Sequence, residues 1–262
     1  MIAATLMFAS VVQSSVGFGM GLVAIPTLVW LGFDLVEAIA ITMTGSFVTS
    51  LISVHSLRRD VPWRPVGLCV SLRTVGLLAG IVALWYLDGL DTARVKQVLG
   101  VVLAVVVLGQ WLWRVRPRER IGWGWTLPAF LISGVMAGAV GMGGPPLVLW
   151  VMAHNWSAKR TRAFTLCSFL VLQPVMMALL VATFGAAAFR AILAGTIGVP
   201  ALFLGTAVGL RLGRRISRSL LQKLAFTLLL LLALSSALSP WLRGRGTAEA
   251  PVATTPEEGA PD

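Results

Sequence analysis

The sequence predicts an all-α integral membrane protein, and three observations support this fold class. The 262 residues are 57% hydrophobic and 12% charged, whereas a soluble domain carries about 25% charged residues. Long apolar runs with almost no charge recur at 98–113, 164–184, 191–210 and 220–238, and about 20 such residues form a helix that crosses a bilayer. The alternation typical of a membrane β-barrel is absent, so we expect the backbone to satisfy its hydrogen bonds within helices.

Apolar runs divide the chain into eight predicted segments, which lie at about 1–32, 36–57, 65–87, 93–113, 124–153, 161–185, 189–210 and 219–240. Short links with turn-forming or charged residues separate the first five, at 32–34, 58–62, 88–91 and 114–122. Beyond residue 244 the chain is rich in Pro, Ala, Thr and Glu, and such a composition buries too little apolar surface to fold. We therefore expect a disordered tail over residues 244–262.

Segments one and five are about 30 residues long, which is too long for one straight crossing, and glycines interrupt each of them in the middle. The two breaks read Gly17-Phe18-Gly19-Met20-Gly21 and Gly141-Met142-Gly143-Gly144-Pro145-Pro146. Aligning Gly17 with Gly141 also aligns Gly19 with Gly143, which indicates an internal duplication. We therefore predict two four-segment membrane repeats, at 1–113 and 124–240, each of which opens with a glycine-broken helix.

The distribution of Lys and Arg distinguishes two ways of threading the segments through the membrane. If all eight segments cross, each side holds ten of these residues. If segments one and five turn back at their glycines, the loops at 58–64, 114–120, 159–162 and 211–223 share one side. That side then holds fifteen basic residues against five. Cytoplasmic loops are enriched in Lys and Arg, so we favour two re-entrant hairpins and inverted repeats, an architecture of secondary transporters.

Several classes of function are excluded by what the apolar runs lack. Apart from Glu37, which we count with the link before the second segment, they contain no Asp or Glu, and no His and Cys residues stand at metal-ligand spacing, so we expect no enzyme, no metal site and no cofactor. The net charge of +11 arises from short basic clusters beside the spans, which indicates a lipid bilayer rather than a nucleic acid as partner. Cys69 and Cys167 lie within apolar runs, where we interpret them as small buried residues.

The two breaks are the predicted binding site. A glycine break at membrane depth leaves unpaired N–H groups at the start of the following half-helix, and the positive end of the helix dipole adds to their attraction for an anion. We assign to this site Gly17, Gly19, Gly21, Gly141, Gly143 and Gly144. The alternative is that glycines only allow close helix packing, which is the role we expect for Gly205 and Gly209.

Polar residues near the breaks are candidates to complete the site. We select Ser15, Thr42, Thr44, Cys167, Ser168 and Gln173, with Gln13, Ser14, Ser46, Ser133 and Thr165 as further candidates. Arg73 lies about two turns inside its span. We expect its side chain to extend to the membrane interface rather than to bind an anion.

The residues around the breaks resemble the TauE/SafE sulfite exporter family. The first break is followed by Ile25-Pro26, with Ala38 at the start of the next helix, and the second break precedes Arg162-Ala163. The resemblance covers roughly residues 5–240. It implies a multi-pass permease of the bacterial inner membrane with eight hydrophobic segments, which moves sulfite, sulfonates or related small organic anions. Met20 and Pro145 depart from the usual run of adjacent glycines, which leaves the substrate open.

The resemblance and the residue pattern together predict a transporter that moves a small anion by alternating access, with the anion held at the half-helix ends. Two alternatives remain at this stage. A small anion channel would use the same helix ends without closing, and a membrane accessory subunit would have no transport activity. The sequence carries no signal for an oligomeric state.

Overall fold

The computed structural model describes residues 1–112 and 121–215, and every element in these ranges is helical. The elements are α1 (Ile2–Val16), α2 (Met20–Trp30), α3 (Leu35–Leu57), a 3₁₀ turn η1 (Arg58–Asp60), α4 (Trp63–Asp88), α5 (Thr92–Leu112), α6 (Trp123–Val140), α7 (Gly144–Met152), α8 (Ala158–Thr196) and α9 (Val199–Arg215). The predicted eighth segment at 219–240, the tail at 244–262 and the basic loop at 114–120 lie outside the described residues.

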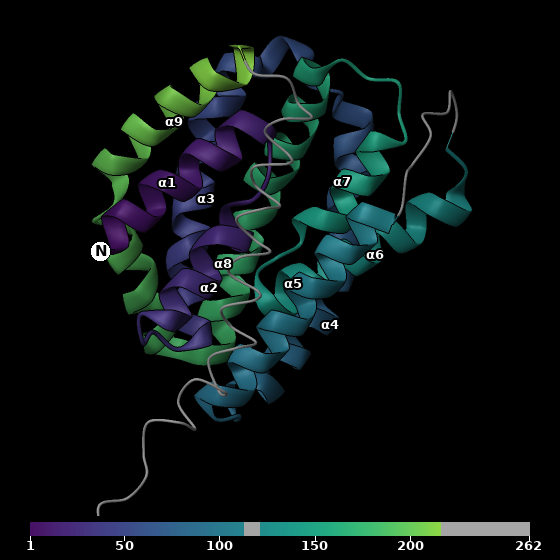
Figure 1. Ribbon diagram of the computed structural model, residues 1–262. Helices are drawn as coiled ribbons and strands as arrows, with labels where there is room; N and C mark the ends of the chain where they lie inside the picture. The colour runs from purple at the N-terminus through teal and green to yellow at the C-terminus, as the bar shows by residue number, and fades with distance from the viewer. Residues whose placement is uncertain (113–120, 216–262) are drawn as a thin grey trace, which may run out of the picture.

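The distribution of polar residues is that of a membrane protein. The helices α3 and α8 pack together at the centre (Figure 1), and α3 is buried although it carries Thr42, Ser46, Thr49, Ser50 and Ser53. The outer faces of α4 and α5 instead expose valines, which are 56–63% accessible at Val75, Val82, Val101 and Val105. An apolar surface around a core with hydroxyl groups is stable in lipid and not in water.

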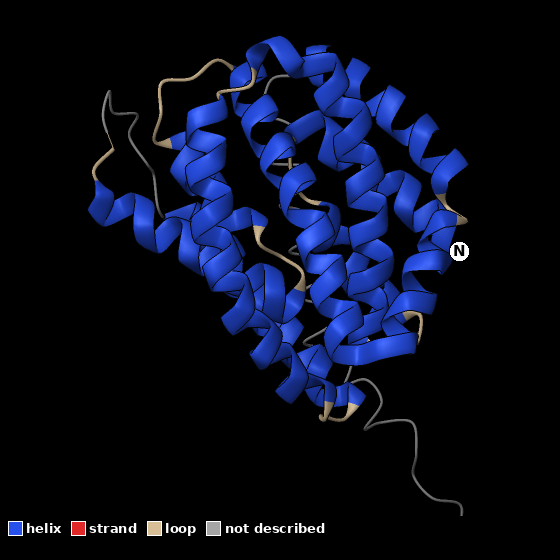
Figure 2. Cartoon of the chain, turned by 180° about the vertical axis from the view of Figure 1, so that it is seen from behind, coloured by secondary structure: helices blue, strands red, loops and turns tan. Residues whose placement is uncertain are grey.

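The length of the helices agrees with several crossings of a membrane. Among the described residues, α3 with η1, α4, α6 and α8 are each long and apolar enough to span a bilayer. The chain is therefore a multi-pass membrane protein. Within the described ranges the helices are joined by short loops and turns, which Figure 2 shows from the opposite side.

Glycines bring two further helix pairs into backbone contact. A Cβ atom on Gly80 of α4 would lie 2.8 Å from Cα of Gly138 in α6, so the two backbones approach as closely as glycine permits. The pair of α1 and α9 is built in the same way, because a Cβ atom on Gly205 or Gly209 would collide with hydroxyl and carbonyl groups of α1. The packing role expected for these two glycines is confirmed.

Each of the two predicted breaks interrupts a helix, at 17–19 between α1 and α2 and at 141–143 between α6 and α7. The indole N–H of Trp150, near the end of α7, donates a hydrogen bond of 3.0 Å to Thr126 at the start of α6. The chain therefore returns along α6 after the second break. In Figure 1 it likewise rises through α1 and descends through α2.

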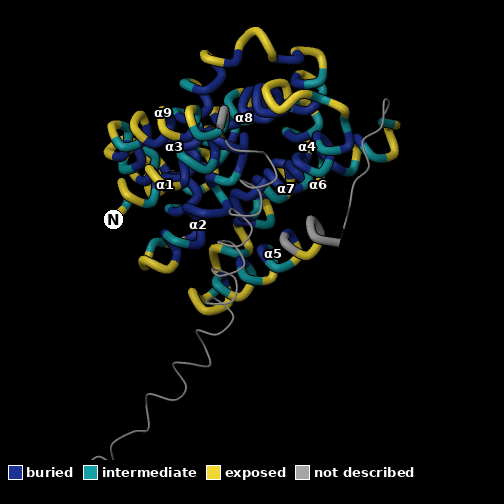
Figure 3. The backbone as a smooth tube through the Cα atoms, turned by 45° about the horizontal axis from the view of Figure 1, so that its top comes forward, coloured by how far each residue is buried: buried dark blue, intermediate teal, exposed yellow. Residues whose placement is uncertain are grey.

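Charged links gather at two ends of the molecule. Leu57, Val66, Trp150 and Phe164 belong to one apolar cluster, so the links before α4 and before α8 lie at the same end, the one turned forward in Figure 3. Arg58 and Arg59 lie in the first of these links, and Lys159 and Arg160 lie in the first turn of α8 directly after the second. The links at 31–34 and 88–91 lie together at the other end, where Asp34 is close enough to Asp88 to interact electrostatically.

Segments six and seven meet where the sequence predicts, and a second interruption follows. The sequence predicts separate spans at 161–185 and 189–210, and the backbone leaves the helical conformation at Gly185, whose φ is +61° and ψ −137°, so that two helices meet there within α8. The chain is interrupted again at residues 197–198, before α9. Gly198-Val199-Pro200 lies inside the predicted seventh segment. Apolar length therefore located the junction between the two spans and did not reveal the second interruption.

Candidate functional site

The two glycine breaks meet in the interior of the molecule. Gly17, Gly19 and Gly141 adopt φ values of +99°, +111° and +68°, which L side chains rarely adopt. A Cβ atom on Gly21 would overlap the carbonyl oxygen of Gly141, so the backbone of α2 lies directly against the second break. This close approach places the start of α2 and the start of α7 around one cavity.

The cavity has a volume of about 40 Å³, in a measure on which one water needs about 10–15 Å³. It is thus matched to a small solute. Its walls come from both breaks and from α1, α3, α4, α6 and α8. The lining residues are Gln13, Gly19, Met20, Gly21, Leu22, Met43, Ser46, Arg73, Ala137, Gly141, Met142, Gly143, Gly144, Phe169, Leu172, Gln173 and Met176.

The start of α2 presents hydrogen-bond donors to this cavity. The helix begins after Gly19 without a side-chain cap, and its first intrahelical bond is donated by Val23 to the carbonyl of Gly19, at 3.1 Å. The preceding N–H groups, those of Met20, Gly21 and Leu22, have no partner within the helix. Together with the positive end of the helix dipole they form a favourable environment for an anion.

The start of α7 presents fewer donors. Pro145 and Pro146 occupy its first turn, and proline has no N–H group. The Ser133 hydroxyl donates to the carbonyl oxygen of Gly143, and the N–H of Met142 donates to the carbonyl of Met136. The two breaks are therefore unequal, because the first offers a row of N–H groups and the second offers little beyond the N–H of Gly144.

The second break is instead accompanied by a guanidinium group. Arg73 of α4 is completely buried, and its Nη2 lies 2.8 Å from the position that a Cβ atom would take on Gly143. Its guanidinium carbon lies 5.0 Å from the centre of the Phe169 ring. The sequence-based expectation that Arg73 extends to the interface is wrong, because close glycine packing of α4 on α6 carries its side chain inward.

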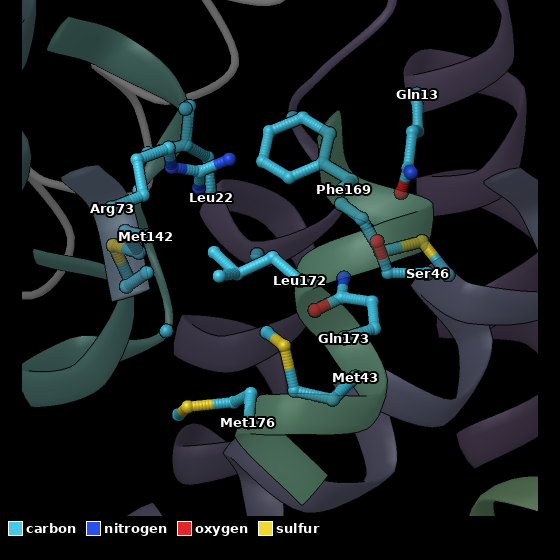
Figure 4. A pocket seen from close by; sticks show the side chains of 17 residues that line it. Gln13, Leu22, Met43, Ser46, Arg73, Met142, Phe169, Leu172, Gln173 and Met176 are labelled. Atoms are coloured by element: carbon cyan, nitrogen blue, oxygen red, sulfur yellow. The ribbon is translucent and has the colours of Figure 1, made fainter. Parts of the chain in front are cut away.

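Arg73 has no carboxylate partner in the described structure. Its Nε and Nη1 atoms make no hydrogen bond, and the one titratable group that acts on it is the thiol of Cys69, one turn earlier on α4. A buried charge normally has a partner of opposite charge or several hydrogen bonds. The guanidinium lies at the cavity wall (Figure 4) with donors to spare.

Polar side chains stand across the cavity from Arg73. Figure 4 shows Gln13, Ser46 and Gln173 beyond the Phe169 and Leu172 side chains. The amide nitrogen of Gln13 donates to the Ser50 hydroxyl at 3.0 Å, and the amide oxygen of Gln13 has no hydrogen-bond partner. Gln173 is 4% exposed. These groups can bind the polar end of a solute without adding charge.

Six of the twelve predicted site residues line the cavity, namely Gly19, Gly21, Gly141, Gly143, Gly144 and Gln173. The other six do not line the cavity, and each lies among other parts of the helix bundle. Ser15 donates to the Gly209 carbonyl, and Thr44 donates to the Ile192 carbonyl. Ser168 donates to its own helix, Cys167 lies in an apolar cluster, Thr42 is buried in α3, and Gly17 packs against Thr165 and Arg162.

Sequence reasoning missed the apolar part of the wall. Phe169, Leu172, Gln173 and Met176 all line the cavity, and their spacing of i, i+3, i+4 and i+7 places them on one face of α8. That face could have been recognised from Gln173, the one polar member. Gln13 and Ser46, which were further candidates, also line the cavity, whereas Ser14, Ser133 and Thr165 do not.

Within residues 1–112 and 121–215, no three His, Cys, Asp or Glu side chains are grouped so that they could hold a metal ion. The cavity contains one charged side chain, that of Arg73. A cavity whose single charge is positive is chemically suited to an anionic solute.

Comparison with known proteins finds one family whose model matches the chain. A family model described as Sulfite exporter TauE/SafE matches residues 2–236. The match includes both breaks, Arg73 and every residue that lines the cavity. No curated protein and no solved structure matches the chain.

The contact between the breaks predicts a cost for adding a single methyl group. Gly21→Ala should lower the stability by about 1–3 kcal/mol, because the new Cβ overlaps the Gly141 carbonyl. Gly67→Ala on α4 is the matched control, since a Cβ atom there has no neighbour within 4 Å. The measurement is the melting temperature of each purified variant in detergent. Equal melting temperatures for the two variants would contradict the close approach of α2 to the second break.

Proposed function

The chain belongs to the TauE/SafE sulfite exporter family, and we propose that it is a permease for sulfite, a sulfonate or a related small organic anion. Its place in the family makes it a membrane transport protein. The observation that supports an anion as the solute is Arg73, a completely buried guanidinium without a carboxylate partner, beside two helix breaks. We propose the inner membrane of a bacterium as its location.

The energetics of a buried charge support this assignment. A lone ion in a low-dielectric interior costs several kcal/mol even after relaxation, unless another charge and hydrogen bonds compensate it. Arg73 has two unsatisfied nitrogen atoms, and the first turn of α2 has unpaired N–H groups on the same cavity. An anion between them would satisfy both sets of donors. Binding of an anion would thus stabilise the folded protein.

A duplicated architecture is supported by matching contacts in the two halves. A Cβ atom on Gly76 of α4 would overlap the carbonyl of Leu131, and one on Gly205 of α9 would approach the carbonyl of Met7. One turn further along each helix, a Cβ atom on Gly80 would overlap the carbonyl of Val135, and one on Gly209 would approach the carbonyl of Val11. Leu131 and Met7 are separated by the same number of positions as Gly141 and Gly17. We infer that residues 1–113 and 124–240 are two repeats. The third segment of each repeat packs on the broken first segment of the other, α4 on α6 and α9 on α1.

An inverted arrangement of the repeats is supported by the positions of the links. The hydrogen bond between Trp150 and Thr126 agrees with a second segment that enters the membrane and returns. Basic links gather at one end of the molecule and Asp34 and Asp88 at the other, as the positive-inside rule requires when segments one and five are re-entrant. We propose that the end with Arg58 and Arg160 faces the cytoplasm.

We propose that transport proceeds by alternating access around this cavity. The glycine contacts bring the backbones of α1 and α9, and those of α4 and α6, close together, so each pair would move as a unit. Each unit carries one break, and the two breaks meet at the cavity. Rocking of the two units against the central α3 and α8 helices would open the cavity to either side in turn.

Arg73 provides a direct test of this function. Arg73→Gln should lower uptake of labelled sulfite into proteoliposomes by more than about a hundredfold, because two hydrogen bonds to a charged group are lost at about 1.5–3 kcal/mol each. Arg94→Gln, at an exposed ion pair with Asp91, is the control and should keep the wild-type rate. Uptake by the wild type should saturate and support counter-exchange, whereas a channel would pass current.

A purely structural role for Arg73 gives a different result. Arg73→Gln would then reduce the yield of monodisperse protein and uptake in parallel. The proposal instead expects an unchanged or higher melting temperature for this variant, because an uncompensated buried charge has been removed. Undiminished uptake per folded molecule of Arg73→Gln would refute the assignment.

The membrane arrangement is testable with an impermeant thiol reagent. Single cysteines at Arg59, Asn155 and Gly89, which are all exposed, are placed in a protein that lacks Cys69 and Cys167. In intact cells, Arg59→Cys and Asn155→Cys should be labelled only after the membrane is permeabilised, and Gly89→Cys should be labelled without it. Labelling of Asn155→Cys together with Gly89→Cys in intact cells would mean that the second broken segment crosses the membrane.

A further inference from the structure

The cavity wall carries one charged side chain, and its charge is positive. Among its lining residues Arg73 is the one ionised side chain, with no Lys, His, Asp or Glu beside it. The titratable group next to Arg73 is the Cys69 thiol on the same helix. The elements that face it present Ser133 from α6, Gly143 from the second break and Phe169 from α8, and none of these groups titrates. The wall thus carries a single positive charge.

The rest of the wall carries no second positive charge. Four methionines, two leucines and a phenylalanine form much of the lining, at Met20, Met43, Met142, Met176, Leu22, Leu172 and Phe169. Their side chains donate no hydrogen bonds to replace lost water. The N–H groups at the start of α2 add only about half a positive charge. A dianion would therefore leave a net negative charge in a buried, mostly apolar site.

We propose that this site selects its substrate by charge state, accepting singly charged oxyanions and rejecting dianions of the same shape. The inference rests on the proposed function and specifies its substrate class. Hydrogensulfite and sulfonates meet the requirement, whereas sulfate and fully deprotonated sulfite do not. The discrimination arises because Arg73 neutralises one charge, and a second uncompensated charge in a low-dielectric site is costly.

The test compares three anions of nearly the same size by calorimetric binding to the detergent-purified protein. Methanesulfonate is singly charged and sulfate is doubly charged at every pH near neutrality, and methylphosphonate changes from one charge to two within that range. Methanesulfonate should bind with an affinity that is independent of pH. Sulfate should bind at least about a hundredfold more weakly. The affinity for methylphosphonate should fall about tenfold for each pH unit above its second ionisation.

The controls separate charge selection from the function itself. Arg73→Gln should lose methanesulfonate binding, and Arg94→Gln should keep it. Methanesulfonate reports any titration of the protein, because its own charge is constant. Equal affinity for sulfate and methanesulfonate would overturn the charge selection and leave an anion site in place. Absence of binding by all three anions to the folded wild type would overturn both the charge selection and the proposed function.

Discussion

A guanidinium group without a carboxylate partner in the interior of a membrane protein requires compensation from the groups around it. Arg73 is fully buried, and two of its three nitrogens have no hydrogen-bond partner. Charged side chains within the bilayer are costly and usually functional. The chain has placed beside it a helix start with unpaired N–H groups and a cavity of about 40 Å³. In the function proposed for this chain, these features together would hold a small anion away from water.

Close packing through glycine makes this arrangement possible. Gly134 of α6 lies against the backbone of Arg73 itself, and Gly143 leaves room for its Nη2 atom. A side chain at either position would displace the guanidinium from the cavity. In lipid there is no hydrophobic force between helices, so such van der Waals contact is a main source of their association. The same glycines therefore stabilise the fold and set the position of the charge.

Much of the architecture could be predicted from the sequence, because lipid leaves the backbone few choices. The helical fold, the two breaks and the link positions up to residue 153 follow from apolar length and glycine content. The site was only half predicted, since hydroxyl groups such as Ser15 and Thr44 bond to neighbouring backbone and never reach the cavity. The inward direction of Arg73 depends on α4 packing against α6, a long-range contact that no local pattern encodes.

The most direct test of this account is to locate the bound anion. Crystals grown with selenite, a selenium analogue of sulfite, would give an anomalous difference map at the selenium absorption edge. The account predicts one strong peak in the cavity, within about 4–5 Å of the Arg73 guanidinium nitrogens and next to the first turn of α2. Selenium peaks confined to exposed arginines, with none beside Arg73, would contradict it.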